Sequence, residues 1–134
     1  MSDQKSRPTV ELRELKETFL YDATPVVTFS ASYPEISGIG TRQARRINAM
    51  YAYAASKFHR YAAKPFYRMA VQGYQDAIRN DYPFRAYDAV MKSTVTYLDP
   101  CLLSTYTDRY EYTGGAHGTT LRLADTWDLR SGFP

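Results

Sequence analysis

The run GGAHG, residues 114–118, has the composition of a loop that could bind a ligand. Closely spaced glycines permit positive φ angles and expose backbone N–H groups, which can hold an anion or a sugar oxygen. The alternative is a hairpin loop whose glycines only satisfy turn geometry, with His117 fixing the loop by a hydrogen bond. Two tyrosines on one face of the preceding segment extend this candidate site. Its residues are Tyr110, Tyr112, Gly114, Gly115 and His117.

A basic stretch is the second candidate site. Residues 41–75 contain seven Lys or Arg and no Asp or Glu, so the rest of the chain has ten basic and 14 acidic residues. On a regular helix, four of these cations share the face opposite to the apolar one. That face could attract nucleic acid (the least favoured partner), wall teichoic acid or an anionic bilayer, or its charges could simply pair with carboxylates on a sheet. The four residues are Arg46, Lys57, Lys64 and Arg68.

Catalytic and metal-binding patterns are sparse. The chain has no Gly-x-Ser-x-Gly elbow, phosphate-binding loop, His-Glu-x-x-His helix or dinucleotide fingerprint. Asp108, Glu111 and His117 lie near one predicted hairpin and could form an acid–base pair, but nothing in the sequence perturbs the two carboxyl groups. His59, His117 and Cys101 are a poor set of zinc ligands, and Cys101 is expected to be a buried small side chain. We therefore expect no enzymatic activity, no metal and no cofactor.

A long helix is the clearest element. Apolar residues recur every three or four positions from Thr41 to about Asn80, which predicts a helix with one apolar stripe. Thr41 is its expected N-cap. Pro65 removes a hydrogen bond to the carbonyl of Tyr61, so we expect a kink or break there.

The remaining segments favour strands. Residues 9–21 predict a strand with a bulge near Glu14, with a short helix as the alternative. Further strands are expected at 26–33, 87–98, 102–112 and 119–129. In the last of these, one face carries four large apolar residues, namely Leu121, Leu123, Trp127 and Leu129.

The expected fold is α+β, in the order β-β-α-β-β-β. Short turns between the strands favour antiparallel pairing, and the long helix is expected to cover one face of a sheet of about five strands. Residues 1–8 are expected to be a disordered tail, and residues 9–134 a single domain. No stretch reaches the roughly 18 apolar residues that a membrane span needs.

Four motifs resemble, in their order and spacing, one known family. They are SYPEI at 32–36, RIN at 46–48, YEYTGGAHG at 110–118 and TWDLRSG at 126–132. Together they resemble the domain that lies outside the membrane in lysozyme-responsive anti-sigma factors (RsiV) and ahead of the catalytic domain in peptidoglycan deacetylases (PdaC). The resemblance covers residues 21–132.

The resemblance implies an extracytoplasmic domain of a bacterial envelope protein that binds or senses a ligand. Peptidoglycan, or a wall-attacking protein such as lysozyme, is then the expected ligand, and a sigma factor would be bound only through another segment. The chain lacks the membrane anchor of such proteins and the segment that follows their Asp-Leu-x-x-Gly turn, so a fragment of a longer protein is expected. The alternatives are a structural spacer attached to a deacetylase domain, or an anion-binding module that uses the basic helix face.

Overall fold

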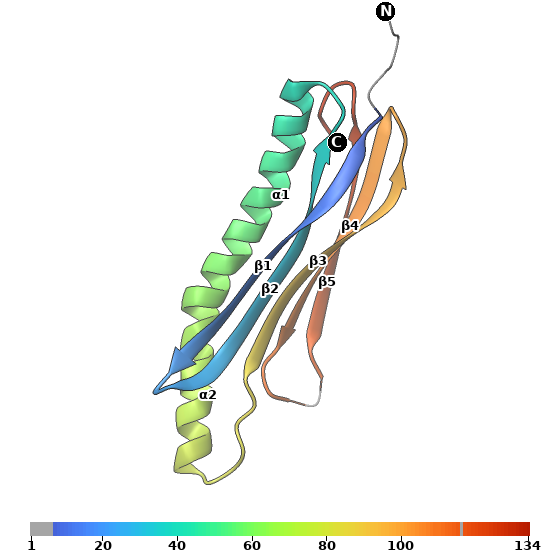
Figure 1. Ribbon diagram of the computed structural model, residues 1–134. Helices are drawn as coiled ribbons and strands as arrows, with labels where there is room; N and C mark the ends of the chain where they lie inside the picture. The colour runs from blue at the N-terminus through green and yellow to red at the C-terminus, as the bar shows by residue number, and fades with distance from the viewer. Residues whose placement is uncertain (1–6, 116) are drawn as a thin grey trace, which may run out of the picture.

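One long helix lies across one face of a five-stranded sheet in the computed structural model, which describes residues 7–115 and 117–134 (Figure 1). The strands are adjacent in the sheet in the order of the sequence. This confirms the expected α+β fold and the order of its elements. The elements are β1 (Thr9–Tyr21), β2 (Thr24–Ser37), α1 (Thr41–Tyr61), a π-helical turn (Ala62–Phe66), α2 (Tyr67–Arg79), β3 (Tyr87–Leu98), β4 (Leu102–Tyr112) and β5 (Thr119–Asp128).

The first segment is a strand along its whole length, so the alternative of a short helix is wrong. The expected bulge near Glu14 is also wrong, because the register with β2 shifts only between Phe19 and Leu20. Between its ends β1 is exposed on both faces, and strict alternation of apolar residues is not needed there. Val10 packs against one core cluster and Phe19 against another. The two ends of β1 thus contact different clusters.

The sheet is mixed, which corrects the expectation of purely antiparallel pairing. The pairs β1–β2, β3–β4 and β4–β5 are antiparallel, but β2 and β3 run parallel over Val27–Ser32 and Tyr87–Lys92. The helix lies in the connection between β2 and β3. It returns the chain to the end of the sheet at which β2 began, and β3 starts from there. A helical crossover of this kind joins parallel strands, whereas tight turns join antiparallel ones.

The helix is continuous through Pro65, and the expected irregularity takes the form of the π-helical turn at Ala62–Phe66. Proline has no N–H to donate, and a single wider turn lets the helix proceed past it. The helix starts one residue earlier than expected from capping, because Gly40 is the N-cap and no side chain caps this end. Thr41 is instead the first helical residue.

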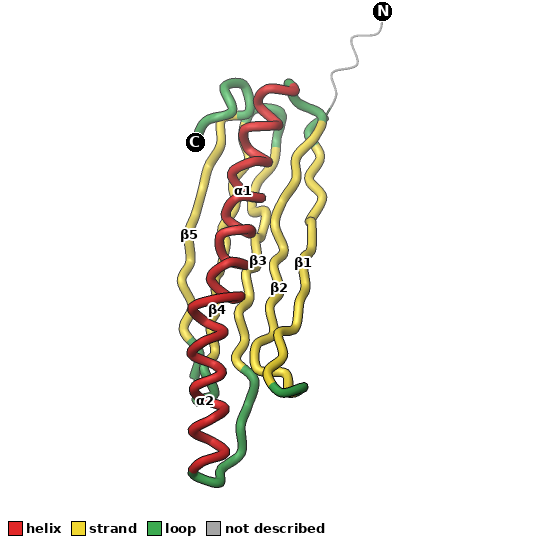
Figure 2. Tube along the Cα trace, turned by 90° about the vertical axis from the view of Figure 1, so that its left-hand side faces the viewer, coloured by secondary structure: helices red, strands yellow, loops and turns green. Residues whose placement is uncertain are grey.

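The core consists of two clusters along the helix. In the first, Phe29 of β2 packs with Phe58 and Phe66 of the helix; in the second, Ile47 packs with Trp127. The helix packs chiefly against β2, and no described element covers the other face of the sheet (Figure 2). We call that face the outer face.

Two of the four large apolar residues predicted on one face of the last strand lie outside these clusters. Leu121 and Leu123 share the helix side of β5 with buried Trp127, but they are 49% and 51% exposed. Their shared face is as predicted. The helix packs chiefly against β2 and covers β5 only near Trp127, so it does not extend over these two leucines. These leucines therefore form an open apolar surface beside the helix.

Cys101 is exposed, which contradicts its expected burial. It lies in the turn between β3 and β4, where the carboxylate of Asp99 accepts hydrogen bonds of 2.7 Å from the backbone N–H groups of Cys101 and Leu102. This turn projects from the end of the sheet, so its side chains have no layer to pack against. Among the helices described, none has the length and hydropathy required to cross a membrane.

Candidate functional site

Tyr106, Tyr110 and Tyr112 lie in a row on the outer face of β4. They alternate with Thr105 and Thr107, which are buried under the helix on the other face. Each of the three tyrosines is half-buried and has one side open to solvent. The row therefore presents aromatic rings on the face that no described element covers.

A charged pair interrupts this row. Arg122 of β5 donates two hydrogen bonds to Asp108, with Nε–Oδ1 and Nη2–Oδ2 distances of 2.7 and 3.0 Å. Its guanidinium also lies 4.0 Å from the centroid of the Tyr106 ring. The hydrogen bond from Arg122 lowers the pKa of Asp108, so this carboxyl group is ionised at neutral pH. The pair fixes a cation within the tyrosine row.

The glycine-rich run connects β4 to β5, as predicted. Gly114 adopts a φ of +85°, where glycine is favoured, and Gly115 and His117 are exposed. Ala116 lies outside the described residues. Gly118 lies directly against the Tyr110 ring, and a Cβ atom at this position would clash with that ring. The structure therefore brings the predicted tyrosines and the predicted loop together at one end of the outer face.

The candidate acid–base pair of Asp108 and Glu111 does not form, because the two residues lie on opposite faces of β4. Glu111 points to the helix side, where its Oε1 accepts a hydrogen bond of 2.5 Å from the hydroxyl of Tyr61. Burial, and then this contact, raises the pKa of Tyr61 to about 12. In the described part of the chain, no three His, Cys, Asp or Glu side chains gather where they could hold a metal ion.

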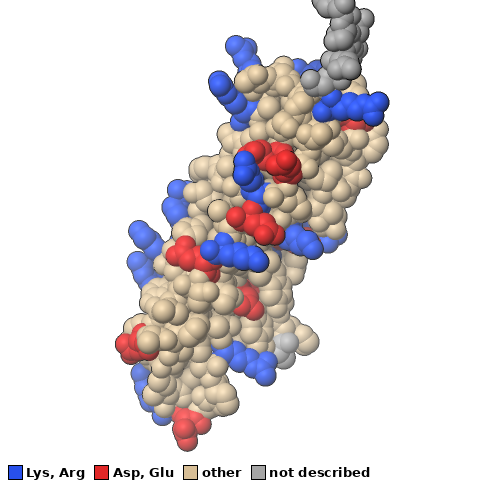
Figure 3. Space-filling model, viewed as in Figure 1, with Lys and Arg blue, Asp and Glu red and all other residues tan. Residues whose placement is uncertain are grey.

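The four residues of the predicted basic face differ in their surroundings. Lys57, Lys64 and Arg68 are exposed, and Figure 3 shows Lys and Arg side chains projecting along the helix edge. Arg46 is not part of this face. Its guanidinium lies 3.9 Å from the centroid of the Phe133 ring, and its Nη1 donates to the carbonyl of Ser131 over 3.3 Å. The C-terminal turn packs on the start of α1. This tertiary contact cannot be predicted from helical periodicity.

The expected pairing of the helix cations with sheet carboxylates is wrong. Within residues 7–115 and 117–134, no ion pair involves any of the seven Lys and Arg residues of positions 41–75. The one contact of this kind from the helix is made by His59, whose Nε2 lies 2.7 Å from Glu17. The basic helix face is therefore solvated and not neutralised by neighbouring carboxylates.

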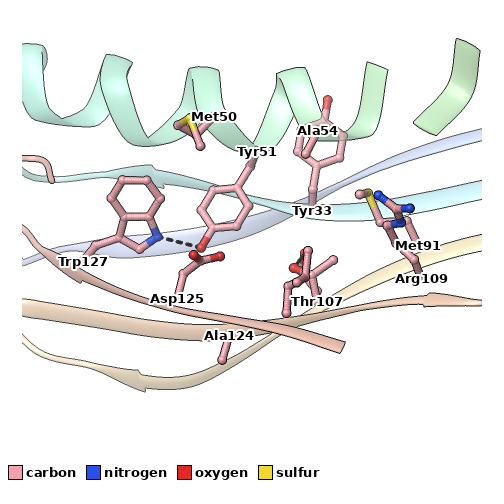
Figure 4. A pocket seen from close by; sticks show the side chains of 12 residues that line it. Tyr33, Met50, Tyr51, Ala54, Met91, Thr107, Arg109, Ala124, Asp125 and Trp127 are labelled. Atoms are coloured by element: carbon pink, nitrogen blue, oxygen red, sulfur yellow. Dashed lines mark hydrogen bonds between the residues drawn. The ribbon is translucent and has the colours of Figure 1, made fainter. Parts of the chain in front are cut away.

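A groove on the helix side of the sheet was missed by the sequence analysis. It has a volume of about 270 Å³ and lies between α1 and strands β3–β5 (Figure 4). Met50 and Ala54 form one wall, and Leu123 and Asp125 of β5 form the other. The hydroxyls of its floor are satisfied by one another, as in the bond of 2.8 Å between Ser93 Oγ and Thr107 Oγ1.

Arg109 is the exception in this floor. Its Nε is buried without a hydrogen-bond partner among the described residues, and its Cζ lies 5.3 Å from the centroid of the Phe58 ring. Among the described residues, the groove thus contains a guanidinium without a counter-ion. One feature of the sequence could have indicated this groove. Asp125 lies on the same face of its strand as Leu121 and Leu123, and a carboxylate argues against full burial of that face.

Comparisons with known proteins place the chain in a family. The model of the family described as "Deacetylase PdaC" matches residues 21–120. A solved structure of a DUF3298 family member from Bacteroides fragilis is similar, with a TM-score of 0.68 at 18% identity, over 97% of this chain and 59% of that chain. A DUF3298 family protein from Pseudomonas aeruginosa gives a TM-score of 0.54 at 13% identity, over 97% and 55%. These two likenesses show the fold, and the chain spans less than two thirds of either structure. No curated protein matches the chain.

Proposed function

The chain belongs to the family described as Deacetylase PdaC, and from this membership we propose a non-catalytic, extracytoplasmic binding domain of a bacterial cell-envelope protein. Its ligand is the glycan of peptidoglycan. Its ligand-binding surface is the outer face of β4 together with the loop to β5. The observation that carries this proposal is the row of Tyr106, Tyr110 and Tyr112 on the uncovered face, with the Tyr110 ring held against Gly118.

The chemistry of this surface suits a polysaccharide. A sugar ring has an apolar C–H face and polar edges, and a tyrosine has an apolar ring with a polar tip, so the two surfaces match. Binding sites typically combine such apolar area with a few oriented polar groups. Arg122 is such a group, because Asp108 and the Tyr106 ring already hold its guanidinium in place. The exposed backbone of Gly114 and Gly115 adds N–H donors for sugar oxygens.

Sedimentation with insoluble peptidoglycan tests the proposal. The variants Tyr110→Ala and Tyr112→Ala should each weaken binding about tenfold, which is the scale of one lost aromatic contact. Tyr53→Ala is the matched control, because Tyr53 is a 59% exposed tyrosine on α1, away from the site. Equal binding by all three variants and the unaltered domain would contradict a role for the outer face.

A wall-attacking protein such as lysozyme is the other ligand class that the resemblance suggests. The same variants should be run with lysozyme in size-exclusion chromatography. Co-migration that is lost in Tyr110→Ala and kept in Tyr53→Ala would assign the outer face to a protein ligand. Failure of the domain to bind either peptidoglycan or lysozyme would overturn the proposed function.

A second candidate function is anion binding by the basic helix face, for example to wall teichoic acid. The absence of ion pairs at its cations, within the described residues, favours it. Affinity for teichoic acid should then fall steeply with added salt, because each neutralised phosphate releases a counter-ion. The triple variant Lys57→Gln, Lys64→Gln, Arg68→Gln should reduce this salt dependence, whereas Lys16→Gln on β1 should leave it unchanged.

A further inference from the structure

We propose that the glycan bound at the outer face carries free amino groups, and that Asp88 of β3 binds one of them, as an ammonium group, beside Tyr112. This assignment rests on the proposed function of the outer face and adds the chemical class of the glycan, a polymer with de-N-acetylated sugars. The relationship that carries it is the pairing of Asp88 with Tyr112 in the register of β3 and β4.

Asp88 lies on the outer face of the sheet, next to the tyrosine row. Its neighbour Ala89 is buried in the core under the helix, so the side chain of Asp88 points to the opposite face. Asp88 is directly opposite Tyr112 and diagonal to Tyr110. Side chains in these two positions have Cβ atoms about 5 Å and about 7 Å apart. A carboxylate therefore lies within reach of both rings.

The carboxylate of Asp88 is held in place but not neutralised. The hydroxyl of Thr28 on β2 donates a hydrogen bond to its Oδ1. No ion pair in the described part of the chain involves Asp88, whereas Asp108 is already paired with Arg122. Lys92, on the same face of β3, is four residues away, or about 13 Å along the strand. Asp88 is half-buried, and a charge in such a position interacts more strongly with a partner than it does in bulk water.

The surroundings of Asp88 favour an organic ammonium group over a metal ion. A hard metal ion takes several oxygen ligands, and no three His, Cys, Asp or Glu side chains gather around one point among residues 7–115 and 117–134. An ammonium group is attracted both by a carboxylate and by the face of an aromatic ring. Tyr110 and Tyr112 supply such rings beside Asp88.

A sugar amine can meet these groups while its ring contacts the tyrosines. The amine is attached directly to a ring carbon, so it lies at the edge of a sugar that packs on Tyr110, and Asp88 lies along the same edge of the tyrosine row. Acetylation removes the positive charge of the amine, so an N-acetylated sugar forms no ion pair with Asp88. The tyrosines therefore bind either kind of sugar, and Asp88 distinguishes between them.

Two tetrasaccharides of equal length test this inference by calorimetry, the tetramer of N-acetylglucosamine and the tetramer of glucosamine. At mildly acidic pH, where its amines are protonated, the glucosamine tetramer should bind about fivefold more tightly, which is the scale of one exposed ammonium contact. In Asp88→Asn this preference should vanish. The affinity of this variant for the N-acetylglucosamine tetramer should be unchanged, which also shows that the variant is folded.

Asp76→Asn is the matched control, because it removes an exposed carboxylate from α2, away from the outer face. It should keep the preference for the glucosamine tetramer. Equal affinity of the unaltered domain for the two tetramers, binding of neither, or a preference that survives in Asp88→Asn would overturn the role of Asp88. Sedimentation with peptidoglycan decides the proposed function separately, since a domain that sediments but does not discriminate between the tetramers keeps the glycan surface and loses only the ammonium site.

The ammonium group of a stem peptide is the other source of the same chemistry. The tripeptide alanyl-glutamyl-lysine carries such a group without a sugar, and it should not displace the glucosamine tetramer. Displacement from the unaltered domain that is lost in Asp88→Asn would assign the ammonium group to a peptide and refute the amino sugar.

Discussion

The indole Nε1 of Trp127 donates a hydrogen bond of 2.8 Å to the hydroxyl oxygen of Tyr51, and this bond joins the last strand to the helix. The same hydroxyl lies 2.6 Å from Oγ1 of Thr105 on β4. Tyr51 is 6% and Trp127 3% exposed, so water does not replace either partner. This buried network fixes how α1 sits over β4 and β5.

Removal of the Tyr51 hydroxyl should destabilise the domain. In Tyr51→Phe the indole N–H and the Thr105 hydroxyl lose a buried partner, which typically costs about 1–3 kcal/mol of unfolding free energy. Urea unfolding measures the change. Tyr53→Phe removes an exposed hydroxyl from the same helix and should shift the free energy by less than about 0.5 kcal/mol. Equal effects of the two variants would show that the network does not contribute to stability.

The contact of Tyr61 with Glu111 should make stability depend on alkaline pH. The pKa of Tyr61 is raised to about 12 in the folded protein by burial and by Glu111. Its contribution to stability is therefore fully present below the unfolded pKa of about 10 and is lost as the pH rises through 12. Ultraviolet titration should show one tyrosine ionising last. Glu111→Gln should lower the pKa of Tyr61 but leave it above 10, since burial is the larger cause. An unchanged titration in this variant would contradict the contact.

Gly118→Ala should displace the Tyr110 ring. The new methyl group would overlap the ring, which must rotate away, whereas the loop backbone need not move. We expect a changed Tyr110 ring environment in NMR spectra and weaker binding at the outer face. Gly115→Ala is the control for the ring environment, because its added Cβ has no described atom within 4 Å apart from its chain neighbours, and its φ is not positive. An identical Tyr110 spectrum in both variants would rule out the predicted contact.

Gly73 of α2 should be coupled to Tyr87 of β3. A Cβ at position 73 would lie 2.7 Å from the Tyr87 hydroxyl oxygen. Gly73→Ala should therefore destabilise the domain, although alanine favours a helix interior by about 1 kcal/mol. In the Tyr87→Phe background the clash is relieved, and the same substitution should be at least about 1 kcal/mol less destabilising. A double-mutant cycle in urea measures the coupling, and additive effects would refute it.

The elements of this fold follow from local periodicity. The apolar stripe of the helix and the alternation in β4 and β5 each depend on neighbouring residues, so the sequence alone was sufficient to identify them. Pro65 likewise marked the irregular turn. The hairpin position of the glycine run followed from the strands on either side of it, and this brought Tyr110 and the loop together as predicted.

What the sequence did not reveal depends on contacts between distant segments. The parallel pairing of β2 with β3 depends on where the helix returns the chain. The exposure of Leu123 depends on how far the helix extends across the sheet, and the position of Arg46 depends on the C-terminal turn. Nor does any local pattern identify Arg109 as a cation without a counter-ion in the part of the chain that the structure describes, because this follows from its distances to carboxylates on other elements.

The parallel pairing of β2 with β3 also separates the sheet into two parts that can fold at different times. Thr28 and Asp88, which meet across it, are 60 residues apart in the sequence, whereas the other strand pairs are joined by short turns. The hairpin of β1 with β2 and the meander of β3 to β5 can each form from local contacts. Pairing of β2 with β3, however, must close the long loop that contains the helix. This seam extends only over Val27–Ser32 and Tyr87–Lys92. We expect it to be the last part of the sheet to assemble and the first to open.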